Sequence, residues 1–155
     1  MRKIELTQGK YALVDDKDFE WLNQWKWHYT GCGYARRCDY SRGKPEKYIY
    51  LHRFLMGFSN KETDHINNNK LDNRRNNLRL VNRSQSMANT LLRKTNTSGF
   101  KGVHLDKTRK KWAVQITKNY KHIHLGRFTD IKQAAFAYNQ AAKKYFGEFA
   151  RINIK

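Results

Sequence analysis

Residues 63–69 read Thr-Asp-His-Ile-Asn-Asn-Asn, and residues 77–81 read Asn-Leu-Arg-Leu-Val. The first stretch ends a short strand pattern and enters a polar loop, because Asn favours turns and tolerates the left-handed backbone conformation. The second stretch predicts another short strand. A helix is expected over Arg83–Leu92, since Asn82 is a good N-cap and Gln85 follows three residues later. The middle of the chain therefore predicts strand, long polar loop, strand and helix.

Asp64 and His65 are adjacent at the end of the first predicted strand, so their side chains should point to opposite sides of it. Hydrolysis of a phosphodiester needs a base that activates water and a cation that stabilises the developing charge. His65 can be that base, and Asp64 with an oxygen from the helix can hold a hard cation such as Mg²⁺. On the helix, Ser86 and Asn89 lie three residues apart on one face. A lone Asp-His pair is structural or merely exposed in most sequences, so the pair alone does not establish a nuclease.

The charge of the whole chain points to an anionic partner. Its 155 residues include 32 Lys and Arg against 13 Asp and Glu, a formal net charge of +19. Such an excess repels itself unless something anionic absorbs it, and nucleic acid is the first candidate. Aromatic residues make up 14% of the chain, which excludes wholesale disorder. No stretch approaches the ~20 apolar residues of a membrane span, and no signal peptide is expected.

The sequence predicts a domain boundary near residues 92–99, which read Leu-Arg-Lys-Thr-Asn-Thr-Ser-Gly and carry no apolar period. The expected domains are 1–94 and 95–155. In the second, strand patterns at residues 103–105, 112–117 and 122–128 precede an alanine-rich helix that Asp130 should cap, with Gln133 as its capping-box partner. This predicts three antiparallel strands covered by one helix, and an α+β fold class overall.

The first fifty residues read as mixed α and β and name no chemistry. A helix is expected over residues 19–24 and strands over 27–29 and 34–37, while the alternation at 47–52 continues toward residue 57. The two cysteines, Cys32 and Cys38, form no disulfide framework, and they lack the paired spacing of a zinc site.

The segment from Leu51 to Thr90 resembles the HNH family of homing endonucleases, whose catalytic unit is a ββα-metal finger. The residues that carry the resemblance are Leu51-His52-Arg53, Asp64-His65-Ile66-Asn67, Asp72-Asn73-Arg74 and Asn77-Leu78-Arg79. It implies that His65 is the general base, that Asp64 is a metal ligand, and that Asn77 braces the loop around the base.

This sequence departs from the family pattern at two positions. The second metal ligand of the family is commonly an Asn one helical turn before another Asn, and Ser86 stands in the first of these places while Asn89 remains. Either Asn89 or a water held by Ser86 then completes the site, or the nuclease is impaired. Asn68 stands where a glycine is often found.

The C-terminal part is similar to the ethylene-response-factor (APETALA-like) type of DNA-binding domain, which phage and bacterial HNH proteins often carry. The matching stretches are Ser98–Val103, Lys111-Trp112, Leu125–Phe128 and Ala134–Tyr138. A sheet with one free face can enter the major groove. The basic residues expected on that face or its turns are Lys101, His104, Arg109, Lys111, Lys118 and Arg127.

The leading hypothesis is a homing-type HNH endonuclease that uses Mg²⁺ or Mn²⁺ to nick or cut double-stranded DNA. The alternative is a DNA-binding regulator or architectural protein with a decayed nuclease centre, and a weaker one is an RNA-binding accessory protein. No membrane association and no obligate protein partner are expected. The expected location is the cytoplasm of a bacterial or phage-infected cell.

Overall fold

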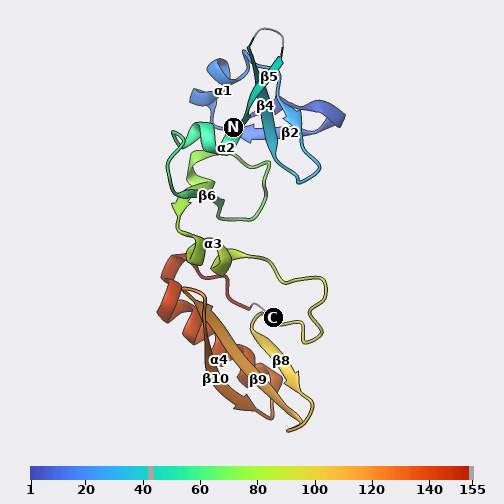
Figure 1. Cartoon of the computed structure of the whole chain (residues 1–155), viewed down its shortest axis with the longest axis vertical. Coiled ribbons are helices and arrows are strands. Elements are labelled where there is room, and N and C mark those ends of the chain that lie inside the picture. Colours follow the sequence, from blue (N-terminus) through green and yellow to red (C-terminus); the bar gives the residue numbers. More distant parts are fainter. Residues whose placement is uncertain (42–43, 154–155) are drawn as a thin grey trace. The chain divides into compact units, whose positions relative to one another are not determined.

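The computed structural model describes residues 1–41 and 44–153 (Figure 1). The chain forms two compact units, Met1–Val81 and Asn82–Lys155. Both contain helices and antiparallel strands. The predicted α+β fold class is therefore confirmed.

The first unit contains a hairpin, a three-stranded sheet and a second hairpin. Its elements are β1 (Arg2–Glu5), β2 (Tyr11–Val14), α1 (Asp16–Leu22), β3 (His28–Tyr29), β4 (Ala35–Ser41), β5 (Lys44–Tyr50), α2 (Leu51–Leu55), β6 (Glu62–His65) and β7 (Leu78–Val81). The sheets have the orders β1-β2, β3-β4-β5 and β6-β7. Short 3₁₀ turns lie at Thr7–Gly9 and Arg75–Asn77.

One core holds this unit together, with Trp27, Leu22 and Leu51 among its fully buried side chains. The alternation that continued past residue 50 was misleading, because the strand ends at Tyr50 and α2 begins at Leu51. Leu51 and Leu55 are one helical turn apart and both are buried. The chain therefore forms a short helix with a buried face here, where the sequence pattern indicated a continuing strand.

The second unit begins with α3 (Arg83–Asn89) and continues with β8 (Val103–Asp106), β9 (Lys111–Lys118), β10 (Lys121–Phe128) and α4 (Ile131–Phe146). The three strands form an antiparallel sheet in the order β10-β9-β8, and α4 packs against it. Both are confirmed predictions. A 3₁₀ turn at Gly147–Phe149 follows α4.

The predicted N-caps of helices α3 and α4 also form. Asn82 and Gln85 make a reciprocal capping box at the start of α3, and the Asp130 side chain accepts a hydrogen bond from the Gln133 backbone at the start of α4. Helix α3 is shorter than expected and ends at Asn89. No helix within the described residues has the length and apolar character to cross a bilayer.

The compact units divide at Val81 and Asn82, because Ala88 of α3 is buried in the same core as Phe100, Val114 and Tyr138. The domain boundary predicted near residues 94 and 95 stays a prediction.

Candidate functional site

Asp64 and His65 lie side by side on β6, where they pair with Arg79 and Leu78 of β7. Strand geometry sends their side chains to opposite faces. His65 is only 4% exposed, whereas the Asp64 side chain is partly exposed. The hairpin thus carries a buried imidazole next to a carboxylate that is 14% exposed.

The imidazole of His65 lies in a pocket of amide and ring groups. Its Nε2 is 3.4 Å from Oδ1 of Asn73, and its ring centroid is 5.2 Å from that of His52 and 6.0 Å from that of Tyr34. Burial lowers the pKa of His65 below its ordinary value, while the Asn73 hydrogen bond and the charges of Asp64 and Asp72 act in the opposite direction. The net effect favours the neutral imidazole, which is the form that accepts a proton.

His52 is a neighbour that the sequence pattern alone did not assign to the site. It lies on α2 and is 8% exposed, and its Nδ1 is buried without a hydrogen-bond partner. Burial, and then the adjacent His65, lower the pKa of His52 to about 3. His52 therefore contributes a neutral, planar wall to the pocket.

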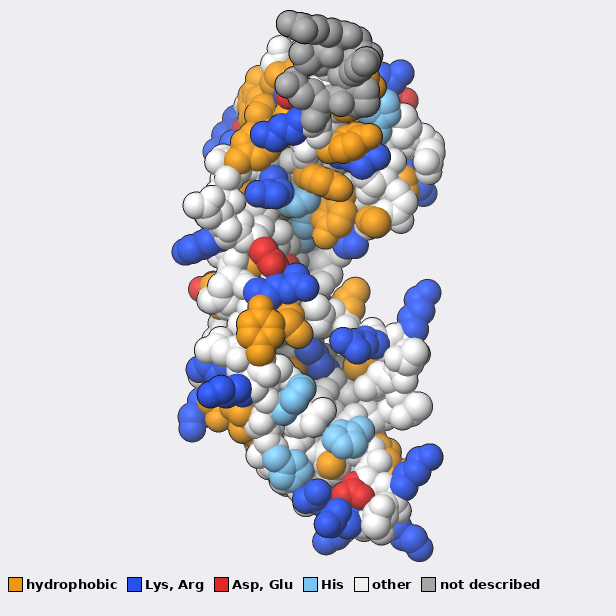
Figure 2. Space-filling view, in the orientation of Figure 1, with side chains coloured by type: hydrophobic (Ala, Val, Ile, Leu, Met, Phe, Trp, Pro, Cys, Tyr) orange, Lys and Arg blue, Asp and Glu red, His pale blue; other side chains and the backbone are white. Residues whose placement is uncertain are grey.

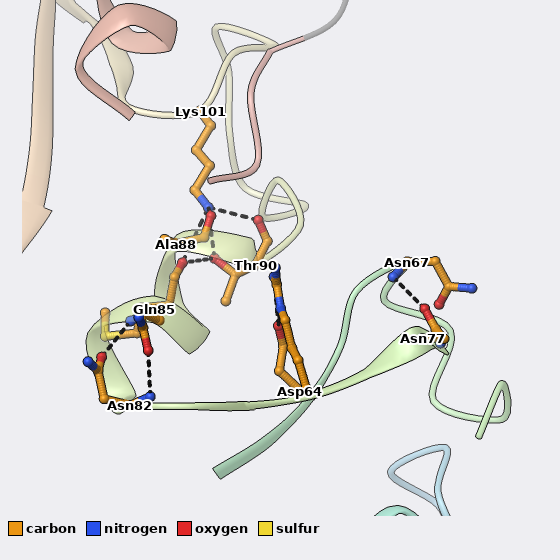
Figure 3. Close-up of polar contacts among 10 residues, drawn as sticks. Asp64, Asn67, Asn77, Asn82, Gln85, Ala88, Thr90 and Lys101 are labelled. Atoms are coloured by element: carbon orange, nitrogen blue, oxygen red, sulfur yellow. Dashed lines mark hydrogen bonds and ion pairs between the residues drawn. The ribbon is translucent and has the colours of Figure 1, made fainter. Parts of the chain in front are cut away.

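Asn77 braces the polar loop between the two strands. Its Oδ1 accepts a hydrogen bond from the Asn67 backbone at 3.0 Å, and its Nδ2 donates to the Asp72 carbonyl at 2.7 Å. Figure 3 shows the contact between Asn67 and Asn77. Asn68 has a φ of 63°, so Asn takes the left-handed conformation where the family often has glycine.

Asp72 anchors the same loop from within. It is 2% exposed and forms a bidentate ion pair with Arg74, whose Nε and Nη2 each lie 2.7 Å from a carboxylate oxygen. The Arg74 hydrogen bonds lower the pKa of Asp72 against the opposing effect of burial. Backbone hydrogen bonds from Leu13 to Leu71 and from Asn73 to Leu13 attach the loop to β2. The loop beside His65 is therefore rigidly held.

Asp64, the expected metal ligand, is paired with Arg79. Its Oδ2 accepts hydrogen bonds from Nε at 3.1 Å and from Nη2 at 3.0 Å of that guanidinium. The pair follows from the register, because the two residues are directly opposite in the β6-β7 hairpin. The other two expected ligands, Ser86 and Asn89, lie on α3 of the second unit, where Asn89 is 5% exposed.

The free face of the second unit's sheet carries three of the six predicted DNA-contact residues, and a fourth lies in the adjoining turn. Residues of β9 alternate, so that Val114 and Ile116 face α4, and Ala113 and Gln115 lie on the opposite side. By register, His104 and Arg127 are opposite Ala113, and Lys111 is opposite Asp106. Arg109 lies in the β8-β9 turn, where it and Arg127 donate to Asp106.

Two further histidines, which the sequence pattern did not single out, share this face. His122 is opposite Thr117 and His124 is opposite Gln115. Figure 2 shows the histidines of this unit together on one side, beside Lys and Arg side chains. Their positions in an alternating strand, two residues apart, were the available signal. Lys118 lies on the helix side instead, where its Nζ is 5.0 Å from the ring centroid of Tyr145.

Lys101 has a different environment from the one expected. Its ammonium donates to the carbonyls of Met87, Ala88 and Thr90, at 3.3, 2.6 and 2.9 Å, at the C-terminal end of α3 (Figure 3). Burial, and then the charge of Arg151, lower the pKa of Lys101 to about 8. Its donors satisfy carbonyls that the helix end leaves without intrahelical partners. We therefore assign Lys101 to this helix end and not to the DNA-contact face.

These contacts give a testable prediction about the second unit. A fragment of residues 82–155 should fold, and a fragment of residues 95–155 should be less stable by at least about 2 kcal/mol, because it loses the carbonyls that accept from the Lys101 ammonium. Thermal unfolding of the two fragments measures the difference. Equal midpoints would contradict the role given to α3 in this unit.

Comparison with known proteins supports the family resemblance of the central segment. A family model described as HNH endonuclease matches residues 59–88. An uncharacterised HNH endonuclease of Acanthamoeba polyphaga mimivirus is 31% identical over 153 residues, which cover 94% of this chain and 76% of the relative. Protein 3.8 of Escherichia phage T7 is 33% identical over 89 residues, 57% of this chain and 73% of that protein. No solved structure matches significantly.

The matched family segment ends before β8 begins. The similarity of the C-terminal sheet and helix to the ethylene-response-factor type of domain therefore stays a prediction.

Proposed function

The chain belongs to the HNH endonuclease family, and on that premise we propose that it is an active, metal-dependent endonuclease of the homing type that nicks or cuts double-stranded DNA. The observation that carries the proposal is the neutral, buried His65 held against Asn73 on the strand that also bears Asp64. His65 offers a general base and Asp64 a carboxylate for a cation, the two groups through which phosphodiester hydrolysis can be assisted.

In the proposed reaction His65 accepts the proton of the attacking water. When Nε2 carries the ring proton and donates to Oδ1 of Asn73, Nδ1 is the basic atom of the imidazole. Asn77 acts at one remove, since its two hydrogen bonds fix the loop that Asn67 and Asp72 belong to. His52 and Tyr34 limit the motion of the His65 ring by packing around it.

The donor atoms proposed for the metal suit Mg²⁺ or Mn²⁺. Asp64 offers a carboxylate, Asn89 an amide oxygen and Ser86 a hydroxyl, and hard divalent cations prefer such oxygens and keep several waters. Within the described residues no three His, Cys, Asp or Glu side chains gather as a metal site. When bound, the cation would stabilise negative charge on the phosphate.

The Asp64–Arg79 ion pair has a consequence for this proposal. A cation bound at Asp64 would compete with the Arg79 guanidinium for the same carboxylate oxygen. Arg79 must then share or release Oδ2, and its charge near the scissile phosphate would remain useful for binding the anionic substrate. We propose that Arg79 exchanges its carboxylate partner for a phosphate oxygen when DNA binds.

The second unit is proposed to hold the duplex on the free face of its sheet. Lys111, His104, Arg109 and Arg127 are the proposed contacts, with His122 and His124 beside them. Lys118, at the end of the central strand β9, is proposed to reach only a phosphate, since its Nζ lies over Tyr145 on the helix side. Most such contacts would be to phosphates, which position the duplex without reading its sequence. The relatives from a virus and a phage support a location inside an infected cell.

The alternative function is a DNA-binding regulator with a decayed nuclease centre. The observation that favours it is Ser86, which stands where the family commonly has an Asn ligand. Serine is shorter than Asn and a weaker ligand. The two functions share the DNA partner and differ only in whether the bound strand is cut.

A two-stage experiment tests the proposal. The full chain, mixed with duplex DNA in EDTA, should bind with an affinity that falls steeply as salt rises, because counterions are released from the phosphates. Addition of Mg²⁺ should then convert supercoiled plasmid to nicked or linear forms. Binding without cleavage in Mg²⁺ and in Mn²⁺ would support the decayed nuclease, and the absence of binding would contradict both functions.

A further inference from the structure

The β3-β4-β5 sheet of the first unit has one face in the core and one face outside it. Ala35 and Ile49 are buried, and the Arg37 guanidinium packs 4.6 Å from the Trp25 ring. Because side chains alternate along a strand, Arg36, Cys38, Tyr48 and Tyr50 lie on the opposite face. We call this second surface, made of Tyr34, Arg36, Cys38, Tyr48 and Tyr50, the outer sheet face.

Arginine and tyrosine are stacked at the centre of this face. The Arg36 guanidinium carbon lies 4.1 Å from the ring centroid of Tyr48, and Tyr48 remains 54% exposed. The register places Cys38 opposite Tyr48 and Arg36 opposite Tyr50, so Arg36 and Tyr48 are diagonal neighbours. A guanidinium held over a ring has already lost part of its rotamer freedom, which favours a fixed contact with an anion.

The outer sheet face is continuous with the pocket of His65. Tyr50 lies 5.9 Å from Tyr34 and 5.8 Å from His52, measured between ring centroids. Tyr34 in turn lies 4.9 Å from His52 and 6.0 Å from His65. A row of neighbouring rings therefore leads from Tyr50, the cross-strand partner of Arg36, to the proposed general base.

A basic side chain lies at each end of this row, Arg36 at one end and Lys70 at the other. Lys70 Nζ lies 4.5 Å from the Tyr34 ring centroid and donates to the Cys32 carbonyl at 2.8 Å. Asp39, the acidic residue of β4, turns to the other side of the sheet, where it pairs with Arg37. Figure 2 shows basic and hydrophobic side chains interleaved over the region that β4 and β5 occupy in Figure 1.

We propose that the outer sheet face is a second DNA-binding surface, which holds the backbone of double-stranded DNA beside the phosphate that is cut. Arg36, positioned by Tyr48, binds one backbone phosphate, and Lys70 binds another nearer to His65. The inference rests on the proposed function, because it takes DNA as the substrate of His65. It assigns a role to the N-terminal strands, which lie outside the matched family segment.

The test is the salt dependence of duplex binding by the full chain in EDTA, where no cleavage occurs. Arg36→Gln should raise Kd about tenfold and lower the slope of log K against log salt by about 1, since one phosphate contact is lost. Tyr48→Leu should raise Kd by a smaller factor, because the guanidinium stays but is no longer held. Tyr48→Phe keeps the ring and should bind as the unchanged protein does.

Arg2→Gln is the matched control. The Arg2 guanidinium also stacks on a ring, 3.5 Å from the Phe19 centroid, but it lies on β1 and pairs with Glu20 of α1. This variant removes the same charge and the same kind of stacking at a residue outside the outer sheet face, so the salt slope should stay unchanged. Thermal unfolding of all four variants shows whether each is folded at the temperature of the binding measurement.

The outcomes separate this inference from the function beneath it. If the unchanged protein binds duplex DNA and Arg36→Gln and Tyr48→Leu bind equally well with the same slope, the outer sheet face is not a DNA surface while the proposed function stands. Equal losses in Arg2→Gln and Arg36→Gln would overturn the inference in the same way, by showing a general charge effect. If the unchanged protein does not bind DNA, both fail.

Discussion

His65→Ala is expected to lower the rate of DNA cleavage by about 10²- to 10⁴-fold, the range that a positioned general base contributes. DNA affinity should be nearly unchanged, because the base acts in the transition state and adds little to ground-state binding. The measurement is single-turnover cleavage of plasmid in Mg²⁺, together with Kd for the same DNA in EDTA. A parallel loss of binding and cleavage would show that His65 is structural.

Two further measurements distinguish a general base from a residue that only packs in the core. Removal of the buried ring leaves a cavity beside His52 and Tyr34, so added imidazole should restore part of the cleavage by His65→Ala. In the unchanged protein, burial lowers the pKa of His65. Cleavage should therefore persist as the pH falls to the ordinary histidine value of about 6.5, and decline only below it as the ring is protonated.

The metal site gives the second large effect. Asp64→Ala should abolish Mg²⁺-dependent cleavage, because it removes the only carboxylate proposed to bind the cation. Asn89→Ala should weaken metal binding and raise the Mg²⁺ concentration needed for half-maximal cleavage, if Asn89 is the ligand from α3. The measurement is the rate of cleavage as a function of Mg²⁺ concentration for each variant.

Ser86→Asn is the matched test of the family departure. In an active enzyme that already uses Asn89, this substitution should change the rate little. If the native protein does not cleave and Ser86→Asn does, the protein is a DNA-binding regulator with a decayed nuclease centre. Cleavage that survives both Asp64→Ala and Asn89→Ala would show that the proposed metal ligands are wrong.

Local patterns were sufficient to predict much of this fold. The alternation of Trp112, Val114 and Ile116, and the caps at Asn82 and Asp130, depend on nearest neighbours along the chain, and each forms as expected. Helix α2 was not predictable in this way, because its five residues are helical through burial of Leu51 and Leu55 in a core built from distant strands.

The residues of the candidate site were likewise predictable from local sequence only in part. The Asp64–His65 pair and the bracing Asn77 were found because the residue types and their order suit hydrolysis. The place of His52 beside His65 was not predictable, because it depends on a tertiary contact between α2 and β6. Lys101 was grouped with the basic DNA contacts because sequence gives its charge and cannot give its burial under the carbonyls of α3.

The most direct test of the account is to sequence the DNA ends produced from a random-sequence duplex pool by the unchanged protein and by His65→Ala. With Mg²⁺ or Mn²⁺, the unchanged protein should produce strand breaks at recurring positions, and these should disappear in EDTA and in the variant. Breaks of the same number and position in His65→Ala, or none from the unchanged protein with either metal, would contradict the proposal that His65 is the base of a metal-dependent endonuclease.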